Sequence, residues 1–142
     1  MFDGVDTSVQ PLFIAPAHLP VWADRVRPHL VKMAEGSGGR YEASDLLYEL
    51  ARGGKQLWVA LRGADVLCAM ISEVHAYPRL RALRLVGIVG YRPLLWRRLL
   101  RIVEEAAKRD FGCAMMEGFH SPEHKALMPD YRVTHWFSEK PI

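Results

Sequence analysis

The sequence contains few cysteines and no long apolar run, and both absences exclude classes of protein. Cys68 and Cys113 are the two cysteines among 142 residues, too few for a disulfide framework and not spaced as zinc ligands. Both fall in apolar segments, so we expect them to be small buried residues. No run approaches the roughly 20 apolar residues of a membrane span, and we see no charged-then-apolar leader. We therefore expect a cytoplasmic protein without a membrane partner.

The chain carries only a small excess of positive charge. The formal net charge is +3, half of the residues are hydrophobic and a quarter are charged, as is usual for a soluble globular protein. Such a small positive charge suits an acidic ligand but gives no strong indication of nucleic-acid binding. A chain of 142 residues is long enough for one domain with its own core. We expect a flexible arm over residues 1–10 and a single domain over residues 11–142.

The stretch from Lys55 to Cys113 carries the clearest structural pattern. Residues 55–62 and 66–76 are rich in branched and aromatic side chains, which predicts two strands joined by a turn at Gly63-Ala64-Asp65. Residues 81–89 predict a third antiparallel strand. A helix then runs from Pro93 to about residue 110, with its apolar residues at helical spacing and proline in its first turn.

The remaining segments complete an alternation of strands and helices. We expect further strands over residues 11–15, 113–118 and 131–139, and helices over residues 18–35, 45–52 and 120–128. Pro28 predicts a kink or two shorter helices in the first of these, and Ser44 is the expected N-cap of the second. The whole order indicates an α/β protein with a mixed, mainly antiparallel sheet and flanking helices.

Several polar residues are candidates for chemistry. Glu73 and His75 share one face of the strand predicted over residues 66–76, and either could accept a proton. The alternative is that both are surface or hydrogen-bonded strand residues. Four later residues have the chemistry of metal ligands, but their spacing matches no metal motif, and we expect no metal site there: Glu117, His120, Glu123 and His124.

Three arginines lie near the start of the long helix. Arg97, Arg98 and Arg101 could form an anion site beside the helix N-terminus, where backbone N–H groups and the helix dipole favour negative charge. The alternative is an ordinary solvated helix face on which these arginines pair with Glu104 and Glu105 at helical spacing.

The order of elements from Pro11 to Lys140 resembles the GNAT superfamily of acyl-CoA-dependent N-acetyltransferases. The local sequences QLWVA, SEVHAYPRLRALRL and the Gly112-Cys113 pair resemble small GNAT-like proteins encoded by tailed bacteriophages. Some of those proteins are internal virion or morphogenesis components. The resemblance implies a GNAT-like fold and acetyl-CoA as cofactor.

The GNAT resemblance places cofactor binding between the third long strand and the main helix. The superfamily holds the pyrophosphate there with a Gln/Arg-x-x-Gly-x-Gly/Ala loop, through backbone N–H groups at a helix N-terminus. This chain has GIVGYRP at that place, without the closely spaced glycine pair and with proline removing one donor. The residues that the resemblance assigns to the cofactor are Gly87, Val89, Gly90, Tyr91, Arg92 and Arg97.

The resemblance also implies a proton donor for the leaving thiolate, often a tyrosine near the short helix. Tyr131 is the nearest candidate, and it could equally anchor the core. Because the pyrophosphate loop departs from the superfamily pattern, our first expectation is a virion or assembly component with weak or absent transferase activity. Its partners would be other virion proteins, in the host cytoplasm or the particle. The alternative is an active acetyl-CoA-dependent N-acetyltransferase acting on an amine of a small molecule or protein.

Overall fold

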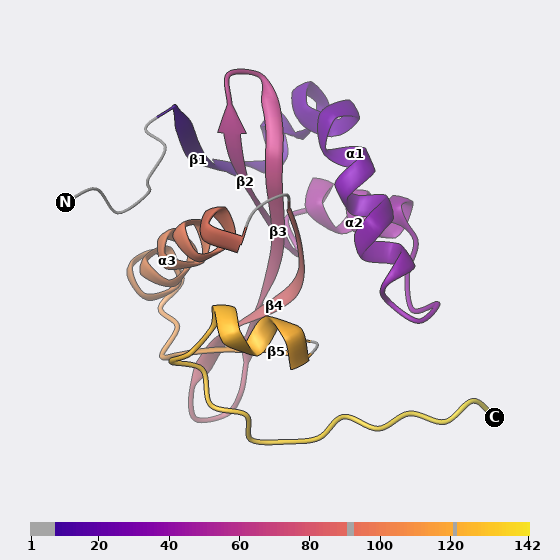
Figure 1. Ribbon diagram of the computed structural model, residues 1–142, viewed down its shortest axis with the longest axis vertical. Coiled ribbons are helices and arrows are strands. Elements are labelled where there is room, and N and C mark those ends of the chain that lie inside the picture. Colours follow the sequence, from indigo (N-terminus) through magenta and orange to yellow (C-terminus); the bar gives the residue numbers. More distant parts are fainter. Residues whose placement is uncertain (1–7, 91–92, 121) are drawn as a thin grey trace.

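The computed structural model describes residues 8–90, 93–120 and 122–142 and contains a five-stranded sheet (Figure 1). Neighbouring strands are antiparallel, except that the last two are parallel. This arrangement agrees with the predicted mixed, mainly antiparallel sheet. In spatial order, which is also chain order, the strands are β1 (Val9–Ile14), β2 (Gln56–Arg62), β3 (Asp65–Ala76), β4 (Arg81–Gly90) and β5 (Met115–Gly118).

Helices cover both faces of the sheet (Figure 1). The first face carries a short 3-10 turn, η1 (Pro16–His18), followed by α1 (Leu19–Glu35) and α2 (Ala43–Ala51). The long helix α3 (Pro93–Arg109) packs on the opposite face. A second 3-10 segment, η2 (Pro122–Leu127), follows β5. No helix in the described part of the chain is long and apolar enough to cross a membrane.

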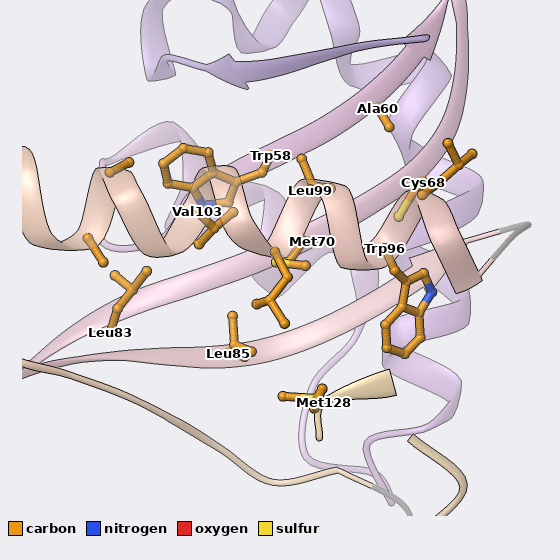
Figure 2. Close-up of a cluster of buried hydrophobic side chains, with 14 of the residues drawn as sticks. Trp58, Ala60, Cys68, Met70, Leu83, Leu85, Trp96, Leu99, Val103 and Met128 are labelled. Atoms are coloured by element: carbon orange, nitrogen blue, oxygen red, sulfur yellow. The ribbon is translucent and has the colours of Figure 1, made fainter. Parts of the chain in front are cut away.

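Each face of the sheet has its own hydrophobic core because successive strand residues point to opposite faces. On the α1/α2 face, Leu57 and Ile71 pack with Val26 and Leu30. The α3 face buries Met70 and Leu83 beneath α3, and Figure 2 shows its side chains beneath that helix. The indole of Trp58 reaches this second core and donates a hydrogen bond of 2.9 Å to buried Ser72 Oγ.

The apolar face of α3 agrees with its sequence pattern in all but one position. Leu95, Leu99, Val103 and Ala106 are buried, as expected. Ile102, predicted to share this face, is 37% exposed, and Trp96 is buried instead. The buried face is therefore wider than the predicted stripe on one side, where it also includes Leu100 and Ala107, and Ile102 lies at its other edge.

Three predictions for the first half of the chain differ from the structure in detail. Pro28 does not divide its helix, because α1 continues from Leu19 to Glu35 with the proline on its exposed side. The second helix begins at Ala43 and is preceded by Glu42, whose backbone N–H donates to Asp45 Oδ2 at 2.9 Å, so Ser44 is not its cap. The strand at the N-terminus also starts earlier, at buried Val9, within the segment expected to be a flexible arm.

The strand predicted over residues 131–139 is absent from the described structure. Tyr131 is at a bend and the residues after it have no regular secondary structure, so they belong to no sheet. The segment contacts the rest of the protein at Tyr131, Phe137 and Glu139, whereas Val133 and His135, which share their alternation, are exposed. Strand pairing requires a neighbouring backbone edge, which a pattern in the sequence cannot supply.

Replacing Leu99 with alanine should destabilise the fold by about 2–5 kcal/mol, because this fully buried side chain would leave a cavity between α3 and the sheet. Ile102→Ala, on the same helix, is the matched control and should cost clearly less because Ile102 is partly exposed. Chemical denaturation of both variants measures the difference. Equal losses of unfolding free energy would contradict the packing.

The thiol of Cys68 should react very slowly in the folded protein. Burial raises its pKa to about 12, and the thiolate is the reactive form. At pH 8 a thiol reagent should therefore label this residue only after denaturant is added. Rapid labelling of Cys68 without denaturant, located by mass spectrometry, would contradict its position between the sheet and α3.

Candidate functional site: a cavity where two parallel strands part

The most distinctive feature of the sheet is the point at which β4 and β5 separate. The two strands pair in parallel over four positions, ending with Leu85 beside Gly118. β4 continues for five more residues, 86–90. Residues 87–90 pair with β3 on their other edge, and the register shifts at Val86, which has no partner residue on β3. The chain after Gly118 leaves the sheet through Phe119 and His120. In the part of the chain that the structure describes, the second half of β4 therefore has no strand on the β5 side.

A cavity of about 330 Å³ lies at this separation. Residues 85–89 of β4 form one wall, so the backbone edge that β5 does not cover faces the cavity. The end of α1 and the loop after it form a second wall, and the segment from Gly118 to Met128 forms a third. Side chains and glycines from these walls include Lys32, Met33, Gly36, Tyr41, Phe119, His120, His124 and Met128.

Four titratable side chains line this cavity: Lys32, Tyr41, His120 and His124. Burial raises the pKa of Tyr41 above its ordinary value, so this phenol stays protonated and can donate a hydrogen bond. The imidazole of His124 lies edge-on to the Trp96 ring, with centroids 4.8 Å apart. Imidazoles are the side chains most often used as general acids or bases near neutral pH.

The residues predicted to bind the cofactor are divided between several places. Gly87 and Val89 line the cavity. Gly90 packs instead against Cys68 of β3, where a Cβ atom would lie 2.8 Å from Sγ. Arg97 lines a second, smaller hollow of about 150 Å³ between α3 and Pro129-Asp130. Tyr91 and Arg92 lie outside the described residues.

The predicted catalytic residues on β3 lie beside the cavity and do not line it. Glu73 is held by Lys55, whose Nζ is 2.6 Å from Oε2. His75 stacks on Tyr77 with ring centroids 4.4 Å apart. Neither belongs to the described residues that form the cavity walls. Their role as bases stays a prediction.

Tyr131 lies against α3 rather than in the cavity. Its hydroxyl donates a short hydrogen bond to the Glu104 carboxylate. Burial, reinforced by this bond, raises its pKa well above the ordinary value of a tyrosine. A hydroxyl with so high a pKa is a weak proton donor, and the contact matches the alternative interpretation of this residue as an anchor.

A polar network joins three segments beside the point of separation. Tyr77 Oη donates to both carboxylate oxygens of Glu117, at 2.8 and 2.9 Å. Arg84 contributes an Nε donor to Glu117 at 3.2 Å and an Nη2 donor to Tyr77 Oη at 3.2 Å. The network ties β5 to β4 and to the turn between β3 and β4. No local sequence pattern indicates this network, because its partners are up to 40 residues apart.

The late acidic and histidine residues do not form a metal centre in the described part of the chain. No three His, Cys, Asp or Glu residues there are arranged to hold an ion. Glu117 belongs to the network with Arg84 and Tyr77, whereas His120 and His124 line the cavity. Of the three arginines near the start of α3, Arg97 and Arg101 line the same small hollow, whereas Arg98 Nη1 donates to the Val9 carbonyl at 3.2 Å.

Solved structures with the same architecture are N-acetyltransferases. A ribosomal-protein-alanine N-acetyltransferase from Brucella melitensis biovar Abortus 2308 matches with a TM-score of 0.69 and 13% identity, over 94% of this chain and 98% of the other. A GCN5-related N-acetyltransferase from Ralstonia eutropha JMP134 matches at 0.66 and 19%, over 94% and 98%. A predicted acetyltransferase with acetyl-CoA from Clostridium acetobutylicum matches at 0.63 and 11%, over 94% and 96%.

These matches define the fold of the chain. Its five-stranded, mostly antiparallel sheet with helices on both faces is the fold of the GCN5-related N-acetyltransferases, abbreviated GNAT. No protein-family model matches the sequence, and no curated protein matches it either. The GNAT-like fold expected from the sequence is thus confirmed.

A methyl group added at Gly87 should destabilise the wall of the cavity. Its Cβ would lie 2.9 Å from Met33 Sδ and 3.1 Å from Cγ, so Met33 must move, and overpacking of this kind costs about 1–3 kcal/mol. Gly36→Ala is the control in the same cavity, because its new Cβ meets backbone oxygens at 3.6 and 3.8 Å, which are ordinary contacts. Unfolding in guanidinium chloride should give a lower free energy of unfolding for Gly87→Ala than for Gly36→Ala. Equal free energies of unfolding would refute the close approach of Met33 to Gly87.

Proposed function

We propose that this protein is an acetyl-CoA-dependent N-acetyltransferase that acts on an amine of a small molecule or protein. The observation that carries the proposal is the cavity where β4 and β5 part, with an open backbone edge on one wall and histidines on another. The GNAT fold and a neighbour whose structure holds acetyl-CoA support the choice of cofactor. This was the alternative interpretation of the sequence.

The residues present fit the pantetheine arm and the phosphate groups of acetyl-CoA. The open edge of β4 over residues 86–89 offers N–H and C=O groups to a chain of amides such as the pantetheine arm, as in strand addition. The start of α3 adds the positive end of a 17-residue helix dipole, which is suited to phosphate. Gly90, packed on Cys68, fixes the end of β4 before this helix.

The amine must lose a proton before it attacks an acyl carbon. When bound, acetyl-CoA supplies an activated acetyl thioester. We assign the proton-accepting role to His120, because it lines the cavity at the position where the chain leaves β5. Tyr41, kept protonated by its raised pKa, lines the same cavity and can donate a hydrogen bond to an oxygen there.

Glu73 remains the competing candidate for the base. Its carboxylate is engaged by Lys55 at 2.6 Å, and it does not line the cavity. The expectation of a virion or assembly component with weak transferase activity stays a prediction, since neither the structure nor the comparisons test it.

The test of the function compares two conservative substitutions in an acetyl-transfer assay. His120→Gln should lower kcat by on the order of a hundredfold while leaving acetyl-CoA affinity nearly unchanged, since it removes proton transfer but not binding. Glu73→Gln is the control and should retain most of the rate. Calorimetry with acetyl-CoA and CoA measures affinity for each protein.

If Glu73→Gln lowered kcat by this amount and His120→Gln retained most of the rate, the base would be Glu73 rather than His120. If wild-type protein binds neither acetyl-CoA nor CoA and acetylates no amine in a panel of small amines and peptides, the transferase proposal fails. The virion or assembly interpretation would then be the one left to pursue.

A further inference from the structure

The ionisable side chains along the cavity where β4 and β5 part favour one sign of charge. Among the described residues that line it, Lys32, His120 and His124 can carry positive charge, and none is an aspartate or a glutamate. A cleft lined by charge of one sign concentrates ligands of the opposite sign. The cavity is therefore suited to a ligand that carries an anionic group.

Lys32 supplies the permanent positive charge of this set, from the last turn of α1. It forms no ion pair with a carboxylate in the described part of the chain. Glu35, in the same turn, is exposed and does not line the cavity. A lysine ammonium is a compact charge with three N–H donors on a flexible stem. Lys32 can therefore turn toward an anion in the cavity without giving up an ion pair within the protein.

Two carboxylates that flank the cavity are already paired with arginines. Glu117, directly before Gly118, is 3.2 Å from Arg84. Glu139 Oε2 is 2.6 Å from Arg40 Nη2, next to the loop wall of the cavity. Because each of these pairs is close to neutral as a unit, neither offsets the charge of Lys32.

The wall that carries Lys32 also offers a neutral hydrogen-bond donor. Tyr41 lies in the loop after α1 and lines the same cavity. Burial raises the pKa of its phenol, which therefore stays protonated. A carboxylate accepts hydrogen bonds through two oxygens. Lys32 and Tyr41 thus offer a cation and a hydroxyl to the same kind of group.

The phosphates of acetyl-CoA are a second source of negative charge, but in the proposed function they lie at the start of α3. That helix and α1 cover opposite faces of the sheet (Figure 1). Lys32 belongs to the α1 side of the cavity, whereas His124 lies against Trp96 of α3. An anion bound by Lys32 is therefore part of the acceptor rather than of the cofactor.

We propose that the amine acetylated in this cavity also carries a carboxylate, as a free amino acid does, and that Lys32 binds this carboxylate. The inference rests on the proposed transferase function, because it names the acceptor class of that same site. With its carboxylate at the Lys32 wall, an acceptor that fits a volume of about 330 Å³ presents its amine to the wall that carries His120. A diamine would instead place an ammonium beside Lys32, where like charges repel.

The kinetic test uses three amines with one carbon skeleton: alanine, alaninamide and 1,2-diaminopropane. They carry a negative, a neutral and a positive group beside the amine. Lys32→Glu should lower the ratio of kcat/KM for alanine over alaninamide by about tenfold or more, and should raise the ratio for the diamine over alaninamide, since attraction becomes repulsion. Lys32→Gln should change both ratios less, in the same direction. Comparing variants on the same amines cancels the differences between the pKa values of the amines themselves.

Arg27→Glu is the matched control. It makes the same change of charge on α1, at an exposed residue that does not line the cavity. Both ratios should stay at their wild-type values in this variant, which separates contact inside the cavity from a change in net charge. Equal shifts in Arg27→Glu and Lys32→Glu, or unchanged ratios in Lys32→Glu, would overturn the inference. Because Lys32 and Arg27 are both exposed, the variants should keep the fold, which circular dichroism checks.

Calorimetry separates failure of this inference from failure of the proposed function. Lys32→Glu should keep the wild-type affinity for acetyl-CoA, and in the presence of CoA it should bind N-acetylalanine, the product formed from alanine, about tenfold more weakly. Weaker binding of acetyl-CoA in this variant would assign Lys32 to the cofactor and overturn its acceptor role. Wild-type transfer confined to amines without a carboxylate would refute the inference and leave the transferase standing. Absence of both acetyl-CoA binding and transfer in the wild-type protein would refute the two together.

Discussion

The structure depends on the separation of two parallel strands after only four paired positions. β5 ends at Gly118, beside Leu85, and a Cβ at Gly118 would lie 3.2 Å from the Leu85 carbonyl oxygen. The close approach holds the strands together at this pair, and the absence of further β5 residues exposes the edge of β4 beyond it. An unpaired sheet edge presents backbone N–H and C=O groups that other segments cover or that a binding partner can pair with. Here it becomes the wall of a cavity that three other segments complete.

Several long-range contacts hold this opening in shape. On one side Arg84 and Tyr77 bind Glu117 and fix the short strand β5. Under the opening, Met33 of α1 fills the space over Gly87. At the outer rim, Phe137 and Glu139 connect the end of β5 with the loop after α1. Packing contacts and ion pairs between distant parts of the chain thus determine the shape of the cavity. In our proposal, His120 is the reactive residue in it.

The sequence predicted the elements of the fold better than it predicted the site. Periodicity identified β2, β3, β4 and α3 because their apolar residues repeat at the spacing of their own secondary structure. Pairing partners are not encoded locally, so the extended segment after Tyr131 was taken for a strand. The cavity depends on which segments meet in space: the resemblance to GNAT proteins pointed to Gly87 and Val89, which line it, whereas the contact of Phe137 with Phe119 has no local pattern.

Chemical-shift mapping with acetyl-CoA tests the central claim most directly. If the opening between β4 and β5 binds the cofactor, backbone amides of residues 86–89 and 118–120 should shift together as acetyl-CoA is added, and should saturate at one equivalent. Amides at the outer surface of α2 should not move. Saturable shifts confined to the hollow near Arg97, or no shifts at all, would contradict the assignment of this cavity as the cofactor site.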